Sequence, residues 1–143
     1  MATDATSLGL SVASPLGMQV DLEVESVQLP AANGEIGILP GHVPILAALK
    51  PGVMRYRVKG GETLIVAVGA GFAEADATRV RVITEFFQRP EDIARAEAES
   101  DFERATETLK HLDAMLGDQA QLDAQKHLDW AIARLDVLGG AVH

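Results

Sequence analysis

Asn33-Gly34-Glu35-Ile36-Gly37-Ile38-Leu39-Pro40-Gly41-His42-Val43-Pro44 is the stretch that constrains the fold most tightly, because glycines and prolines alternate with apolar residues along it. Asn33 and Gly34 both accept positive φ, so this pair predicts a tight two-residue hairpin turn. Ile36 and Ile38 then alternate with a glycine, as in a short, half-buried β-strand. The stretch therefore predicts a sharp corner between two β-strands.

The second half of the same stretch predicts a rigid loop. Pro40 and Pro44 stop strand pairing and hold His42 between them at the surface. A loop that is fixed by prolines and glycines loses little conformational entropy when it docks on a partner. We therefore interpret it as an interaction surface of fixed shape and not as a mobile catalytic loop.

The composition limits the class of protein. The chain has 143 residues, 48% of them hydrophobic, and no cysteine. Disulfides, thiolate metal sites and cysteine nucleophiles are therefore excluded. We expect no secretory signal at residues 1–4, and the longest uncharged apolar run, residues 64–73, is too short to cross a bilayer as a helix. Any membrane association is expected through protein partners, with no direct membrane insertion.

Charge is distributed unevenly along the chain. Residues 1–90 carry nine acidic and seven basic side chains, whereas residues 91–143 carry twelve acidic and five basic ones. Pro90 lies at the junction, where its fixed φ suits the first turn of a helix. We therefore predict two parts, 1–90 and 91–143. The net charge of −9 argues against a nucleic-acid partner, because phosphate neutralisation needs clustered lysine and arginine.

Residues 1–90 predict an antiparallel β-sandwich of about eight to ten short strands, because alternating apolar segments are separated by glycine and proline turns. The alternation at residues 20–24 resumes in the opposite phase at residues 27–29. We therefore expect a bulge near Glu25-Ser26. Residues 43–49 show no such alternation and are predicted to be irregular or a single helical turn.

Residues 91–143 predict an antiparallel two-helix hairpin, which makes the predicted fold α+β. The first helix is expected to begin near Glu91, and Gly117-Asp118 is expected to separate the two helices, with Asp118 or Asp123 as N-cap. Each helix carries an apolar stripe, and the stripes are expected to face each other. They are Phe102, Ala105, Leu109, Leu112 and Leu116 in the first helix, and Leu128, Ala131 or Ile132, Leu135 and Leu138 in the second.

Motifs that carry enzymatic chemistry are not found in the sequence. Gly69-Ala70-Gly71 follows a predicted strand, but Glu74 stands where a dinucleotide fingerprint needs its third glycine, so we interpret the glycines as a close strand-to-strand step. Glu35 and His42 flank the rigid loop without a pocket-forming pattern around them. No pair of histidines has metal-ligand spacing on a helix, and no phosphate-binding loop is present. We therefore predict no catalytic residues, no metal, no cofactor and no intrinsic enzyme activity.

Several segments resemble, in their order and spacing, the epsilon subunit of the F-type ATP synthase, and the resemblance covers almost the whole chain. The segments are Val24-Glu25-Ser26-Val27-Gln28-Leu29-Pro30, Pro40-Gly41-His42-Val43-Pro44-Ile45-Leu46, Leu49-Lys50-Pro51-Gly52-Val53, Val68-Gly69-Ala70-Gly71-Phe72-Ala73-Glu74, Arg79-Val80-Arg81-Val82 and the end of the second helix, residues 131–138.

This resemblance implies a non-catalytic subunit of the central stalk, which couples proton translocation to ATP synthesis by joining the gamma subunit to the c-ring. It maps the interface with the c-ring and gamma onto Asn33, Gly34, Glu35 and His42, with Glu35 meeting a basic group of a ring loop. It also implies a peripheral location on the cytoplasmic face of the bacterial plasma membrane, through the complex, and contacts of the hairpin with the alpha and beta subunits.

The resemblance also implies regulation by the hairpin, which in this family folds against the sandwich or extends to inhibit ATP hydrolysis. Some members bind ATP through a motif that maps onto residues 91–96. Asp92 and Arg95 match it, but Glu91 replaces an apolar residue, and its additional carboxylate would repel phosphates. We therefore predict weak or absent ATP binding. The acidic excess of residues 91–143 also argues against strong inhibition, since insertion against an acidic loop of beta requires basic side chains.

A different class of protein fits the same patterns. The chain could be an independent β-sandwich binding module that dimerises through its helical hairpin, with Leu109, Leu112 and Leu116 pairing between two copies. Co-purification with a gamma subunit and a c-ring would separate the two hypotheses.

Overall fold

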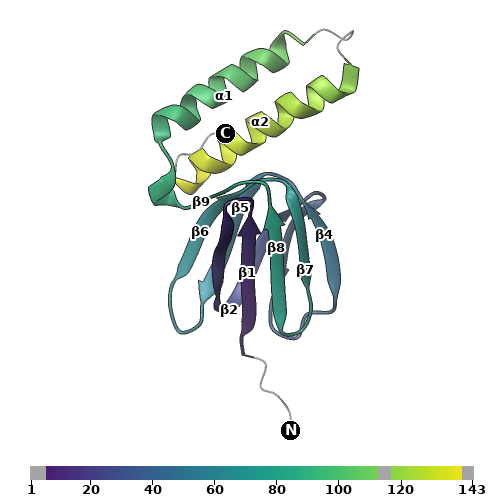
Figure 1. Ribbon diagram of the computed structural model, residues 1–143, viewed down its shortest axis with the longest axis vertical. Helices are drawn as coiled ribbons and strands as arrows, with labels where there is room; N and C mark the ends of the chain where they lie inside the picture. The colour runs from purple at the N-terminus through teal and green to yellow at the C-terminus, as the bar shows by residue number, and fades with distance from the viewer. Residues whose placement is uncertain (1–5, 113–116, 140–143) are drawn as a thin grey trace.

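Nine strands and a helical hairpin make up the part of the chain that the structure, a computed structural model, describes: residues 6–112 and 117–139 (Figure 1). The strands are β1 (Leu8–Ser14), β2 (Gly17–Ala31), β3 (Gly34–Ile38), β4 (Ile45–Leu49), β5 (Gly52–Val58), β6 (Thr63–Val68), β7 (Gly71–Ala75), β8 (Arg79–Thr84) and β9 (Phe87–Gln88). A single 3-10 turn, η1 (Pro90–Asp92), leads to helices α1 (Arg95–Lys110) and α2 (Gly117–Val137). The predicted α+β organisation is confirmed.

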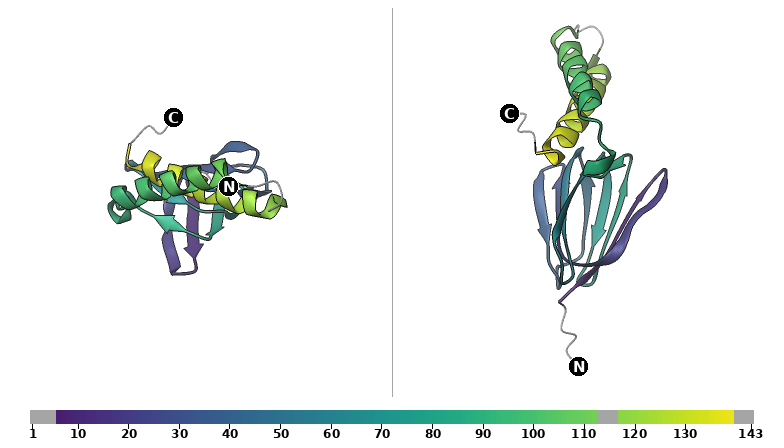
Figure 2. Two further views of the ribbon diagram at one scale, coloured as in Figure 1. Left: turned by 90° about the horizontal axis from the view of Figure 1, so that it is seen from above. Right: turned by 90° about the vertical axis from the view of Figure 1, so that its left-hand side faces the viewer.

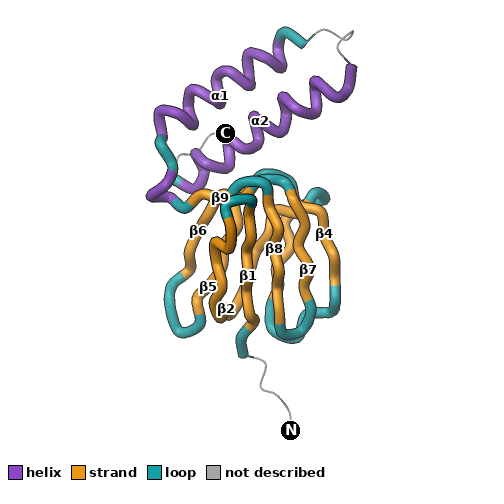
Figure 3. Tube along the Cα trace, viewed as in Figure 1, coloured by secondary structure: helices purple, strands orange, loops and turns teal. Residues whose placement is uncertain are grey.

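The strands form one sheet that folds over itself into two layers around an apolar core (Figure 3). The hydrogen-bonded order is β1-β8-β7-β4-β2-β5-β6-β9, with β3 on β2 and with β1 also paired to β2. The register of β2 against β5 shifts between Val24 and Ser26, which is the predicted bulge. This bulge allows β2 to pair with β1 in its first half and with β3 and β5 in its second half. One pair, β1 with β8, is parallel, so the sandwich is not wholly antiparallel.

The prediction for residues 43–49 is wrong, because β4 occupies residues 45–49. All five residues of β4 pair with β7, from Ile45 opposite Ala75 to Leu49 opposite Gly71. The sequence of β4, Ile-Leu-Ala-Ala-Leu, has no polar residue, and Ile45 is the one residue in it with a strong β-propensity. Its pairing with β7, more than twenty residues away in sequence, decides its conformation.

The turn between β2 and β3 also differs from the prediction. Ala31 pairs with Gly34, so the two turn residues are Ala32 and Asn33. Gly34 has a φ of +126°, and no described residue other than glycine has a positive φ. Asn33 therefore lacks the positive φ that the predicted Asn33-Gly34 turn requires. Gly34, which follows the turn, accommodates the change of chain direction.

The helices begin at different residues from those predicted. Pro90 starts η1, Ile93 and Ala94 are extended, and α1 begins only at Arg95. Asp118 and Asp123 lie inside α2, which begins at Gly117, so neither is its N-cap. Leu116 of the predicted stripe lies outside the described residues.

The hairpin docks on the sandwich through α2. Helices α1 and α2 are antiparallel and pack on each other, and α2 also packs against β5 and β6 at one end of the sandwich (Figures 1 and 2). Ala133 and Val137 of α2 are buried against Ala67, together with the half-buried Val53 and Ile65. The structure therefore shows the folded form of the hairpin.

We expect residues 1–89 to fold without the hairpin, because β9 ends at Gln88 and truncation after Arg89 removes no strand. Near-UV circular dichroism should retain a signal from the buried Tyr56, and hydrogen exchange should show protected core strands. A fragment without near-UV signal and without slow amides would show that the two parts form one folding unit.

Candidate interaction surfaces

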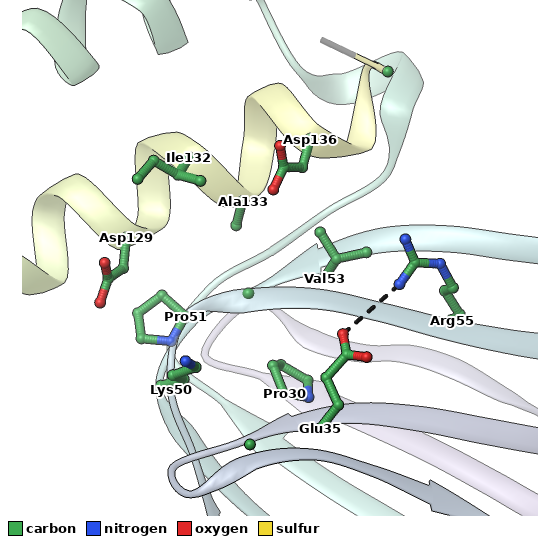
Figure 4. Close-up of a pocket in the computed structure, with 13 residues that line it drawn as sticks. Pro30, Glu35, Lys50, Pro51, Val53, Arg55, Asp129, Ile132, Ala133 and Asp136 are labelled. Carbon is green, nitrogen blue, oxygen red and sulfur yellow. Dashed lines mark ion pairs between the residues drawn. The ribbon is translucent and has the colours of Figure 1, made fainter. Parts of the chain in front are cut away.

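The corner formed by Gly34 and Glu35 lies beside α2, and its carboxylate is held in place by two neighbouring strands (Figure 4). Gln28 Nε2 donates a hydrogen bond to Glu35 Oε1 at 2.9 Å, and Arg55 Nη1 lies 3.9 Å from Glu35 Oε2. The side chain of Glu35 is 53% exposed. A carboxylate that is held in this way can still accept a further donor from a partner.

A groove of about 650 Å³ separates this corner from α2 (Figure 4). Asp129 and Asp136 line it from the helix, and Lys50 and Arg55 line it from the sandwich. The described residues contain no ion pair between these two sets. A partner that binds at the Gly34–Glu35 corner would therefore also meet the docked α2.

The structure separates His42 from this corner. The loop that carries His42 packs on the turn between β7 and β8, where Gly41 N–H donates to Ala77 O at 2.8 Å. That turn points away from the helices (Figure 1). Asn33, Gly34 and Glu35 therefore form one patch near α2, and His42 belongs to another at the opposite end of the sandwich, so Glu35 and His42 do not form an acid–base pair.

The loop around His42 is held by hydrogen bonds of its own backbone and side chain. His42 N–H donates to Leu39 O at 3.1 Å, and the Nδ1 atom of its ring lies 2.6 Å from Val43 O. The supporting turn is fixed by Asp76, whose carboxylate accepts hydrogen bonds from the backbone N–H groups of Thr78 and Arg79. The bond from Thr78 lowers the pKa of Asp76 below its ordinary value.

A third surface, which the sequence analysis missed, is an apolar row across the outer face of five strands. Cross-strand pairing places five residues side by side in this row: Met18 of β2, Ala13 of β1, Ile83 of β8, Phe72 of β7 and Ala48 of β4. Met18, Ile83 and Phe72 are each about 60% exposed or more. A sheet face in contact with water normally carries polar residues at these outward positions. Apolar residues at the outward-facing positions of β7 and β8 were the sequence signal that could have predicted this surface.

The two residues of the predicted nucleotide motif do not converge on a common site. Asp92 lies in η1, and Arg95 is the first residue of α1. Arg95 Nη2 donates to Leu138 O at the end of α2, at 3.3 Å. The guanidinium therefore closes the base of the hairpin, and within the described residues no ion pair joins it to the carboxylate of Asp92.

We expect weak or absent ATP binding by the isolated chain. Arg95 is surrounded in sequence by Glu91, Asp92, Glu97 and Glu99, whose field opposes phosphate. Isothermal titration with MgATP should give no saturable heat, and Arg95→Ala should not change that result. A micromolar dissociation constant that disappears in Arg95→Ala would contradict this prediction.

Arg134 of α2 is a buried charged residue between the two helices. The apolar stripes in the sequence did not predict it. It is 5% exposed, and its Nη2 atom donates to Asp101 Oδ2 at 2.9 Å. Its guanidinium also lies 5.3 Å from the centre of the Trp130 ring. The ion pair therefore joins α1 to α2, in addition to the buried alanines of both helices, and the cation–π contact lies within α2.

Two further features are absent from residues 6–112 and 117–139. These residues contain no group of three or more histidine, aspartate or glutamate side chains arranged to hold a metal ion. Neither α1 nor α2 combines the length and the apolar character that a membrane-crossing helix requires.

Comparison with known proteins gives one consistent result. A family profile described as the β-sandwich domain of the ATP synthase delta/epsilon chain matches residues 7–90. The ATP synthase epsilon chain of Cyanothece sp. (strain PCC 7425 / ATCC 29141) is 37% identical over 136 residues, which cover 95% of this chain and 98% of that protein. The epsilon chain of Francisella tularensis subsp. holarctica (strain OSU18) is 38% identical over 137 residues, 94% of this chain and 90% of that protein.

Solved structures agree with the fold. A chain in the cryo-EM structure of the Euglena gracilis mitochondrial ATP synthase (OSCP/F1/c-ring) has a TM-score of 0.79 at 19% identity, and the match covers 99% of this chain and 85% of that one. The β-sandwich followed by a helical hairpin is thus a fold that also occurs in a chain of an ATP synthase assembly. The chain belongs to the epsilon-chain family of the F-type ATP synthase, as the resemblance in its sequence predicts.

Proposed function

We propose that this chain is the non-catalytic rotor subunit that joins the gamma subunit to the c-ring of a bacterial ATP synthase, on the cytoplasmic face of the plasma membrane. The observation that supports this role best is the presence of separate interaction surfaces on one rigid sandwich. One is the apolar row on the outer sheet face, and the others are the Gly34–Glu35 corner and the His42 loop. A rigid body with separate docking surfaces can transmit torque between two partners.

The gamma subunit is the partner that fits the apolar row. Contiguous apolar surface of this kind is kept small on monomeric proteins and is typical of stable subunit contacts. The polar loops of a c-ring fit the two remaining surfaces, where Asn33, Gly34, Glu35 and His42 lie. Because these residues occupy two patches, we infer that they contact different partner segments.

The hairpin carries the regulatory part of the proposal. In its docked position it lies against β5 and β6, and release from that position would free it to contact the alpha and beta subunits. Arg134 and Arg95 are both engaged within the hairpin, and basic residues are few. Inhibition of ATP hydrolysis is therefore expected to be weak. We also expect the docked hairpin to respond to contacts with other subunits more than to nucleotide.

A charge introduced into the apolar row should weaken gamma binding. We expect Phe72→Glu and Ile83→Glu each to weaken binding to purified gamma at least about ten-fold, because a buried, unpaired carboxylate is costly at an interface. Leu122→Glu is the matched control, since Leu122 is 59% exposed on α2, away from this face. Surface plasmon resonance measures all three; equal affinities for the row variants and the control would contradict the proposal.

The alternative, a module that dimerises through its hairpin, is less well supported. The apolar stripes needed for pairing between copies are packed against each other within one chain, with Ala105 and Ala131 buried between the helices. A second copy would have to displace these contacts.

A further inference from the structure

Glu85 and Phe86, which connect β8 to β9, form a second contact of the sandwich with α2, beside the one made by β5 and β6. The ring centroids of Phe86 and Trp130 are 5.2 Å apart, with an interplanar angle of 27°. Lys126 Nζ lies 3.3 Å from Glu85 Oε1. Lys126 and Trp130 are one helical turn apart and share one face of α2, so they engage two adjacent residues of the sandwich together.

The Glu85-Phe86 segment is held by the Gly69-Ala70 turn. Glu85 N–H donates to Ala70 O at 2.9 Å, and Gly69 N–H donates to Phe86 O at 2.9 Å. Phe86 also packs directly on Gly69, because a Cβ added there would lie 2.9 Å from the Phe86 ring. Phe86 therefore contacts both a glycine of the sandwich and Trp130 of the hairpin.

Thr84 fastens this turn from inside the sandwich. Its side chain is almost fully buried, and Oγ1 lies 2.9 Å from Gly69 O, 3.0 Å from Phe86 O and 3.4 Å from Ala70 O. One hydroxyl proton serves one of these carbonyl oxygens at a time, and Gly69 O is the nearest. Without the hydroxyl, the buried Gly69 O loses this donor, whereas Phe86 O and Ala70 O keep the backbone N–H groups of Gly69 and Glu85. The loss of a donor to a buried carbonyl loosens the turn.

We propose that Thr84 is the positioning residue for hairpin docking: its hydroxyl holds the Gly69-Ala70 turn and thereby orients Phe86 and Glu85 toward Trp130 and Lys126. The inference rests on the proposed regulatory function of the hairpin. These five residues would set the fraction of molecules in which the hairpin is docked on the sandwich. It also gives Gly69-Ala70-Gly71 a role, since only glycine leaves room for Phe86 at position 69.

The test uses the full chain, in which Trp130 is the single tryptophan and reports docking by its fluorescence. In Thr84→Val we expect a red-shifted emission and about three- to ten-fold faster hydrogen exchange in α2, with protection of β2 and β5 retained. Thr84→Ser keeps the hydroxyl and should behave like the parent chain. Phe86→Ala removes the stacked ring at a half-exposed position and should release α2 directly.

Two results would overturn the positioning role. One is a Thr84→Val chain with unchanged emission and unchanged exchange in α2, while Phe86→Ala alters both. The other is equal acceleration of exchange in α2, β2 and β5, which a purely structural role would produce. The regulatory function is tested separately: if Phe86→Ala releases α2 but hydrolysis by the reconstituted complex does not change, that function fails and the positioning role stands.

Discussion

Gly71→Ala is expected to destabilise the sandwich by about 3 kcal/mol, which corresponds to a fall in melting temperature of roughly 10–20 °C for a domain of this size. A Cβ at position 71 would lie 1.9 Å from Ile83 O and 2.9 Å from Thr84 Cα. Both contacts are with backbone, so no side-chain rotation can relieve them. Strands β7 and β8, which pair Gly71 with Thr84, would have to move apart.

Gly37→Ala provides the matched control for this prediction. Gly37 also lies in a strand, but a Cβ there would meet nothing within 4 Å, and its φ is not positive. We expect its stability to be unchanged or slightly raised, because alanine reduces the entropy of the unfolded chain. Thermal and urea unfolding, followed by far-UV circular dichroism, measure both variants. Equal stabilities would show that the β7–β8 approach is not as close as the structure indicates.

Arg134→Ala is expected to destabilise the hairpin by about 2–4 kcal/mol and to melt it before the sandwich. The substitution leaves a cavity between the helices and removes the buried partner of Asp101, whose side chain is 30% exposed. It also removes the cation–π contact with Trp130. Arg134→Lys should give an intermediate loss, because lysine keeps the charge but not the planar group that stacks and donates twice.

Arg104→Ala is the control, because Arg104 contacts the same carboxylate from the surface. Its Nη2 atom lies 3.3 Å from Asp101 Oδ1, and its side chain is 71% exposed. Solvent screening limits such a pair, so we expect a loss below about 0.5 kcal/mol. Urea unfolding followed by Trp130 fluorescence reports the hairpin. A loss in Arg104→Ala as large as that in Arg134→Ala would mean that burial does not decide the strength of these pairs.

The sequence by itself determined the features that depend on neighbouring residues. The alternation of apolar residues predicted both halves of β2. The bulge between them lies where that alternation changes phase, from Val24 to Ser26. The three- and four-residue spacing of apolar side chains identified both helices. The glycines and prolines around His42 predicted a rigid loop. Motif order over the whole chain was enough to identify the family.

The tertiary structure decided which distant segments meet. Strand β4 exists because β7 pairs with it, and no local pattern in residues 45–49 records that pairing. Glu35 and His42 are close in sequence but belong to opposite ends of the sandwich, because β3 carries the chain from one end toward the other. Arg134 is buried and Thr84 reaches Gly69 only after long-range packing brings their partners together. Local sequence patterns determine whether a side chain points toward the core or toward solvent. Pairing between distant segments determines which residues it contacts.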